Sequence, residues 1–148
     1  MSSRSPDTAA ILSRVGKLVR ELTRQVGGAD DGPAMTATQR IALVELGEDS
    51  PLRLNDLAHR MGTSAPTASR AVDVLEGLGL ARRAPEPGDR RALSIALTAE
   101  GRALFDGRFA QAAVAFAPAT ASLSADERRT LIGLLEQMTT ALRDGGDA

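Results

Sequence analysis

The sequence predicts a mainly α-helical fold with one small β-hairpin. Apolar residues recur at intervals of three and four over most of the 148 residues, which is the spacing of an amphipathic helix. One segment departs from this pattern, because Leu93, Ile95 and Leu97 alternate with small residues as in a strand. Residues 85–90 have the proline, glycine and aspartate content of a hairpin loop, so we expect residues 80–84 to form the partner strand.

The composition is that of a folded protein, and it argues against several kinds of site. Hydrophobic residues make up 43% and charged residues 25%, with a net charge of −1. The lack of cysteine excludes disulfides and thiolate sites, and a single histidine argues against a histidine metal site or a Ser-His-Asp triad. With no glycine-rich phosphate loop either, we predict that the protein is not an enzyme and uses no metal and no cofactor.

The sequence also argues against a membrane protein. The first residues are polar, and the longest uncharged stretch, residues 109–125, is interrupted by polar side chains and Pro118. We therefore expect a cytoplasmic protein.

Two helices are predicted before residue 50. The first has an apolar face that recurs at helical spacing and ends at Gly27-Gly28, and this face consists of Ile11, Leu12, Val15, Leu18, Val19 and Leu22. A second, short helix follows Thr36, which stands three residues before Gln39 as in a capping box, and it ends near Gly47.

Four more helices are predicted along the chain. A short helix over residues 54–61 is closed by Gly62, and Thr63 or Ser64 can cap the next helix, which ends at residues 77–79. After the hairpin, Thr98 is placed to cap a helix that weakens at Pro118. Ser124 and Glu127 have the spacing of a capping box at the start of the last helix.

The central elements, in the order short helix, short helix, capped helix and hairpin, form a winged helix-turn-helix. The capped helix, which follows Ser64, is expected in the major groove of double-stranded DNA. An arginine of the hairpin, or wing, is expected in the adjacent minor groove. Residues 52–91 carry seven basic and five acidic residues, net +2, between acidic flanks. The candidate DNA contacts are Ser64, Ala65, Pro66, Thr67, Ser69, Arg70, Arg90 and Arg91.

Structural roles compete with these assignments. Ser64 is interpreted first as a helix cap, and Arg70 could pair with an acidic residue one turn away on the helix surface. Arg91 could be held inward by Asp73, which would leave Arg90 as the groove contact. His59 could equally be a surface residue, and the phenylalanines could belong to a hydrophobic core.

Residues 65–83 resemble the recognition helix and first wing strand of MarR-type transcription regulators. Asp89-Arg90-Arg91, Leu97-Thr98 and Gly101 resemble the wing of that family and its exit. The resemblance implies a homodimer that binds a palindromic operator, acting as a repressor released by a small aromatic or phenolic effector. The absence of cysteine excludes the thiol-based oxidant sensing of some members.

The resemblance also suggests a division of the chain. Residues 1–34 and 100–148 are expected to supply the dimerisation helices, and residues 35–99 the DNA-binding lobe. An effector pocket is expected to involve His59, Phe105 and Phe109. The alternative function is a winged-helix module that binds protein or organises complexes without a specific operator.

Overall fold

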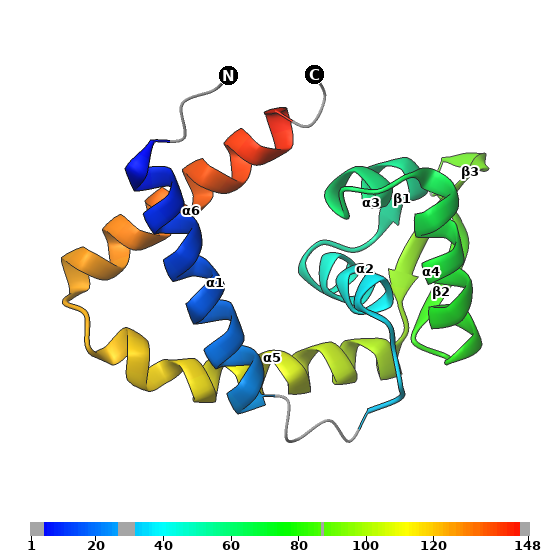
Figure 1. Ribbon diagram of the computed structural model, residues 1–148. Coiled ribbons are helices and arrows are strands. Elements are labelled where there is room, and N and C mark those ends of the chain that lie inside the picture. The colour runs from blue at the N-terminus through cyan, green and yellow to red at the C-terminus, as the bar shows by residue number, and fades with distance from the viewer. Residues whose placement is uncertain (1–4, 27–31, 87, 146–148) are drawn as a thin grey trace.

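The computed structural model describes residues 5–26, 32–86 and 88–145. A small lobe of short helices and strands stands on one side, and long helices lie on the other (Figure 1). The elements within the described residues are α1 (Pro6–Val26), α2 (Ala37–Glu48), β1 (Leu52–Arg53), α3 (Leu54–Arg60), α4 (Ala65–Gly77), β2 (Ala81–Glu86), β3 (Asp89–Leu97), α5 (Ala99–Ala121) and α6 (Ala125–Gly145).

Helices α2, α5 and α6 begin at side chains that the sequence predicts as caps. Thr36 and Gln39 form a reciprocal capping box at α2, and Ser124 and Glu127 exchange the same two bonds at α6. The Thr98 hydroxyl accepts from the Gly101 N–H at 3.0 Å and starts α5. Each cap satisfies backbone donors that have no partner within the helix.

The sheet contains a strand that the sequence pattern does not reveal. The order is β1-β3-β2 with both pairings antiparallel, and Leu52 and Arg53 of β1 lie opposite Ile95 and Ser94. A two-residue strand is too short to show a periodicity, which is why it escapes sequence reasoning.

The hairpin also differs in detail from the prediction. Its strands extend to Glu86 and from Asp89, so the loop is shorter than the expected residues 85–90, of which Pro87 lies outside the described residues. Ile95 and Ser94 are both buried, whereas Leu93 is 54% exposed. The predicted alternation of buried and exposed side chains therefore fails at Leu93, which lies beyond the residues of β3 that pair with β1.

The buried hydrophobic residues of the described chain lie in the lobe, between Met35 and Ile95. The fully buried large side chains among them are Leu43, Leu46, Val72, Leu57, Leu75 and Ile95, from α2, α3, α4 and β3. This core fixes α4 and the hairpin relative to each other, as a DNA-binding surface on both of them would require.

The first turn of α5 packs directly on the backbone of the lobe. A Cβ atom at Gly101 would lie 1.9 Å from the Leu80 carbonyl oxygen, so only glycine fits there. The Thr98 N–H donates to the same carbonyl at 3.0 Å, and the Thr98 hydroxyl donates to the Gly79 carbonyl at 2.6 Å. The lobe and the start of α5 are thereby joined by direct backbone contact and by the Thr98 hydroxyl.

The two terminal helices bury no residue of their own within the described chain. On α6 the exposed apolar residues are Leu131, Ile132, Leu134, Leu135, Met138 and Leu142, and on α1 they are Ile11, Leu12, Val15, Leu18 and Val19. Helix α5 continues through Pro118 to Ala121, so the helix does not end at the proline. No helix among the described residues is long and apolar enough to cross a membrane.

Candidate nucleic-acid interface

The N-terminal turn of α4 presents a line of connected polar side chains. Ser64 is the N-cap, and its hydroxyl accepts from the Thr67 N–H at 3.3 Å, which confirms the predicted capping role. The Ser64 hydroxyl also lies 3.0 Å from that of Thr67, which accepts from Arg70 at 3.5 Å. Ala65 and Pro66 form the first helical positions, where a proline costs no hydrogen bond.

Arg70 has no ion pair in the part of the chain that the structure describes, and its side chain is exposed. The alternative in which an acidic residue one turn away pairs with it is therefore not what the structure has. A cation and two hydroxyls at a helix N-terminus are groups that suit a phosphate.

The wing carries two further exposed arginines. Gly88 has φ +90°, a conformation that L side chains rarely adopt, and Asp89 follows it. The Asp89 carboxylate accepts from the Arg91 N–H at 3.0 Å, which shapes the backbone after the turn. Neither the Arg90 nor the Arg91 guanidinium has an ion pair within residues 5–26, 32–86 and 88–145, so both remain candidates for the minor groove.

Arg83 of β2, and not Arg91, is the arginine that Asp73 holds inward. It pairs with Asp73 at 2.9 Å and with Glu76, and its backbone N–H donates to Glu76 at 2.8 Å. Its guanidinium also donates to the Ser69 carbonyl and hydroxyl at 3.2 and 3.1 Å. Ser69, a predicted DNA contact, is thus already an acceptor for the wing, and Arg91 is not held by Asp73.

The seven arginines of residues 52–91 fall into two groups. Arg53, Arg60 and Arg83 each have an acidic partner, and Asp49 pairs with Arg60 at 2.5 Å. The exposed arginines without an ion pair in the described chain are Arg70, Arg82, Arg90 and Arg91. Three of these four lie on α4 and at the outer end of the hairpin, which we call the outer wing (residues 86–93). Positive charge without an acidic partner is therefore concentrated where DNA would lie.

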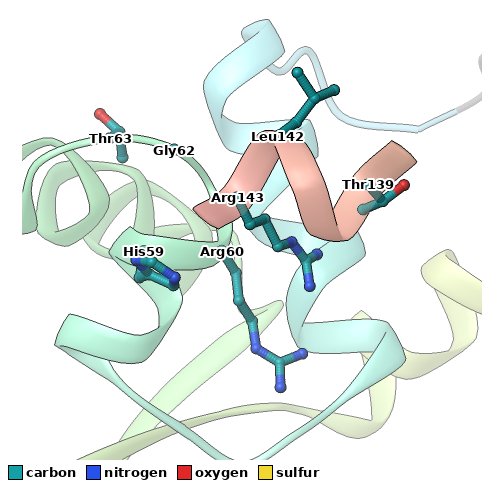
Figure 2. Close-up of a pocket in the computed structure, with 7 residues that line it drawn as sticks. All are labelled: His59, Arg60, Gly62, Thr63, Thr139, Leu142 and Arg143. Atoms are coloured by element: carbon teal, nitrogen blue, oxygen red, sulfur yellow. The ribbon is translucent and has the colours of Figure 1, made fainter. Parts of the chain in front are cut away.

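The predicted effector residues occupy two separate places. His59 lines an open pocket of about 580 Å³ between the end of α3 and the end of α6, with Arg60 and Arg143 (Figure 2). Phe105 and Phe109 stack on α5 with ring centroids 6.1 Å apart. The structure does not bring the histidine and the two rings together.

Phe105 has a clear packing role. A Cβ atom at Gly47 would come within 2.3 Å of the Phe105 ring, so the ring lies flush against α2. Arg102 covers the same ring at 5.6 Å and donates to the Gly47 carbonyl at 2.6 Å. Phe109 is 64% exposed and remains available to a ligand or a partner chain.

Glu45 of α2 is the unusual carboxylate of this region. Its Oε2 atom is buried and has no hydrogen-bond partner among the residues that the structure describes. Burial raises the pKa of the Glu45 carboxyl above its ordinary value, and the nearby Glu48 raises it further, while Arg143 and Arg60 lower it. No cluster of potential metal ligands occurs among the described residues.

Sequence reasoning missed the arginines that hold the wing. The strand alternation from buried Ala81 places Arg83 on the same inward face, so the pattern contained a signal for it. The pairing of Arg53 with Glu86 gave no such signal, because 33 positions separate the two residues.

Comparisons with known proteins agree with this architecture. A sequence model of the MarR family matches residues 35–92. The HTH-type transcriptional repressor NicR of Pseudomonas putida is 29% identical over 114 residues, which are 77% of this chain and 72% of NicR.

Two solved structures are similar over most of the chain. A probable transcriptional regulator from Pseudomonas aeruginosa is 32% identical, covers 86% of this chain and 98% of its own, and has a TM-score of 0.58. CouR from Rhodococcus jostii RHA1, solved bound to p-coumaroyl-CoA, is 26% identical with a TM-score of 0.71, over 94% of this chain and 96% of CouR.

Proposed function

The chain belongs to the MarR family of winged helix-turn-helix transcriptional regulators, and from this premise we propose that it represses transcription as a homodimer on a palindromic operator. The N-terminal turn of α4 enters the major groove, where Ser64, Thr67 and Arg70 meet phosphates and base edges. The wing lies along the adjacent minor groove with Arg90 or Arg91 inserted.

The observation that carries this proposal is the distribution of paired and unpaired arginines. Arg83 is neutralised by two acidic residues behind the DNA-facing surface, whereas Arg70, Arg90 and Arg91 have no ion pair in the described chain. Guanidinium groups without an acidic partner bind phosphate without first breaking an ion pair, which favours association with DNA.

The exposed terminal helices support the proposed homodimer. In the described chain neither α1 nor α6 buries a residue, yet each exposes a continuous apolar face. Because exposed faces of this kind are covered in stable proteins, a second copy of the chain is the occupant we propose. Residues 1–34 and 100–148 then form the dimer, and residues 35–99 form each DNA-binding lobe.

The repressor role and the effector are proposed from the relatives. NicR is named a repressor, and CouR binds p-coumaroyl-CoA, which carries an aromatic group. We propose that a small aromatic ligand binds between the dimer helices and a lobe, with exposed Phe109 as its ring partner. Such a ligand releases DNA only if it binds one dimer conformation better than the other.

The experiment that tests the proposal is fluorescence anisotropy with labelled duplexes from the gene's own upstream region and with a scrambled duplex. Salt-dependent, preferential binding to one duplex by a protein of dimer mass in light scattering is the expected result. Each phosphate contact should contribute about −0.9 to the slope of log affinity against log salt. Equal binding to all duplexes would instead favour the architectural module, and no binding at low salt would overturn the DNA-contact assignments.

A further inference from the structure

A fork-shaped ion pair joins the beginning of α3 to the outer part of the wing. The Arg53 Nε donates to Glu86 Oε1 at 2.9 Å, and Nη2 donates to Oε2 at 2.5 Å. Arg53 belongs to β1 and Glu86 is the last residue of β2, so the pair bridges the two outer strands across β3. A bidentate pair of this kind restricts orientation as well as distance.

The pair contacts the wing where its hydrogen-bonded ladder becomes irregular. The pairing of β2 with β3 is continuous up to Pro85 and Leu93, and then shifts so that Glu86 lies opposite Asp89. Arg90, Arg91 and Ala92 therefore stand in an irregular stretch of β3. Glu86 is the β2 residue paired closest to the two candidate minor-groove arginines.

The outer wing has little other support from the lobe. β1 reaches only as far as Ser94, so beyond that point β2 is the sole strand partner of β3 among the described residues. An open groove of about 590 Å³ lies between the start of α3 and the outer part of β3, with Arg53 and Arg91 both in its lining. A two-stranded ribbon without further packing is marginally ordered in water.

The choice of arginine at position 53 is not explained by the helix that it begins. Arg53 is the N-cap residue of α3, and its side chain makes no capping hydrogen bond. Serine, threonine, aspartate or asparagine would stabilise the helix at this position. The side chain instead reaches the wing, where the hydrogen bond from Arg53 also lowers the pKa of the Glu86 carboxyl.

We propose that Arg53 and Glu86 are positioning residues of the wing, which together fix the reach and direction of Arg90 and Arg91 toward DNA. This inference rests on the proposed function as a DNA-binding regulator. The pair acts as a clamp: without it the outer wing loses its tie to the lobe, and the arginines at its end must be ordered by DNA at the cost of affinity.

The proposed clamp and simple phosphate attraction predict different effects on DNA affinity. Arg53→Gln removes a positive charge and Glu86→Gln removes a negative one, so phosphate attraction alone would weaken binding in the first variant and strengthen it in the second. If the pair positions the wing, both substitutions weaken binding by about fivefold, and the double variant loses no more than the stronger single variant.

The test measures anisotropy with a palindromic duplex recovered by the unmodified full-length protein from a random library. The variants are Arg53→Gln, Glu86→Gln and their combination, each also made together with Arg90→Ala and Arg91→Ala. Asp49→Asn is the matched control, since it also removes an acidic residue from an ion pair of the lobe, that with Arg60, away from the wing. Circular dichroism melting curves check that every variant is folded.

The expected result is weaker binding by both single variants, a normal affinity for Asp49→Asn, and no further effect of Glu86→Gln once Arg90 and Arg91 are alanine. Binding by Glu86→Gln as tight as that of the unmodified protein, or tighter, would overturn the clamp. An equal loss with and without the two wing arginines would also overturn it, because the residue would then act on the lobe as a whole. Recovery of no duplex by the unmodified protein would overturn the proposed function, and the role of the clamp with it.

Discussion

Two adjacent arginines of β2 have opposite environments. Arg83 faces α4 and is held by Ser69, Asp73 and Glu76, whereas Arg82 is exposed and has no ion pair in the described chain. The half-buried Arg83 thus satisfies two carboxylates and joins the wing to the recognition helix. Removing its side chain would leave the Glu76 carboxylate with only the backbone N–H of residue 83 as a donor and would break the ion pairs with Glu76 and Asp73, which costs more than the loss of an exposed charge.

We expect Arg83→Met to lower the free energy of unfolding by about 1–3 kcal/mol in urea titrations. Arg82→Met is the matched control, and a surface substitution of this kind changes stability by no more than about 0.5 kcal/mol. Equal effects of the two substitutions would contradict the inward role of Arg83.

Glu45 makes stability depend on pH in an unusual direction for a carboxylate. Because burial raises its pKa in the folded state, the folded protein holds the proton more tightly than the unfolded chain. The contribution of protonated Glu45 to the free energy of unfolding is therefore lost as pH rises from the pKa of the unfolded chain to the higher pKa of the folded protein. At pH 7 the ionised carboxyl lowers the free energy of unfolding.

Glu45→Gln is accordingly expected to raise the urea midpoint at pH 7, and to raise it less at pH 4, where the carboxyl is largely protonated. The exposed Glu136→Gln on α6 is the control for a general change of charge. A gain at pH 4 as large as that at pH 7 would show that ionisation of Glu45 is not the cause.

At the scale of elements, the junction between the lobe and α5 depends on one glycine. The Leu80 carbonyl occupies the place of a side chain at Gly101, whereas nothing lies within 4 Å of a Cβ at Gly107, two turns further along the same helix. We expect Gly101→Ala to cost about 3 kcal/mol or more in unfolding free energy, and Gly107→Ala to add about 0.5–1 kcal/mol. Thermal melts of both variants test this contrast.

The elements themselves could be predicted because their signals are local. Thr36, Ser64, Thr98 and Ser124 all cap the helices that the sequence assigns to them, since a cap and its partner lie three residues apart. Strand β1 and the Arg53–Glu86 pair could not be predicted, because both depend on contacts with residues more than 30 positions away. The separation of His59 from Phe105 could not be predicted for the same reason, because it depends on how segments far apart in the sequence pack together.

At the scale of the whole molecule, the apolar faces of α1 and α6 should decide the oligomeric state. Leu135 is 50% exposed in the apolar row of α6. Leu135→Glu introduces a charge into the proposed interface, which should reduce the mass in light scattering from twice the 15.4 kDa of one chain toward a single chain and weaken DNA binding. Gln137→Glu, an exposed polar position of the same helix, should leave the mass unchanged. A monomeric unmodified protein would contradict the homodimer.

The junction at Gly101 gives the molecule the mechanics of a rigid lever. Because the first turn of α5 has backbone contact with Leu80, the lobe and this helix must tilt together. A helix of 23 residues is about 35 Å long, and a tilt of about 5° over that length displaces its end by about 3 Å. That displacement is close to the rise of about 3.4 Å per base step along one strand of DNA. A rotation of a few degrees at the far end of α5 is therefore enough to move a recognition helix by one base step.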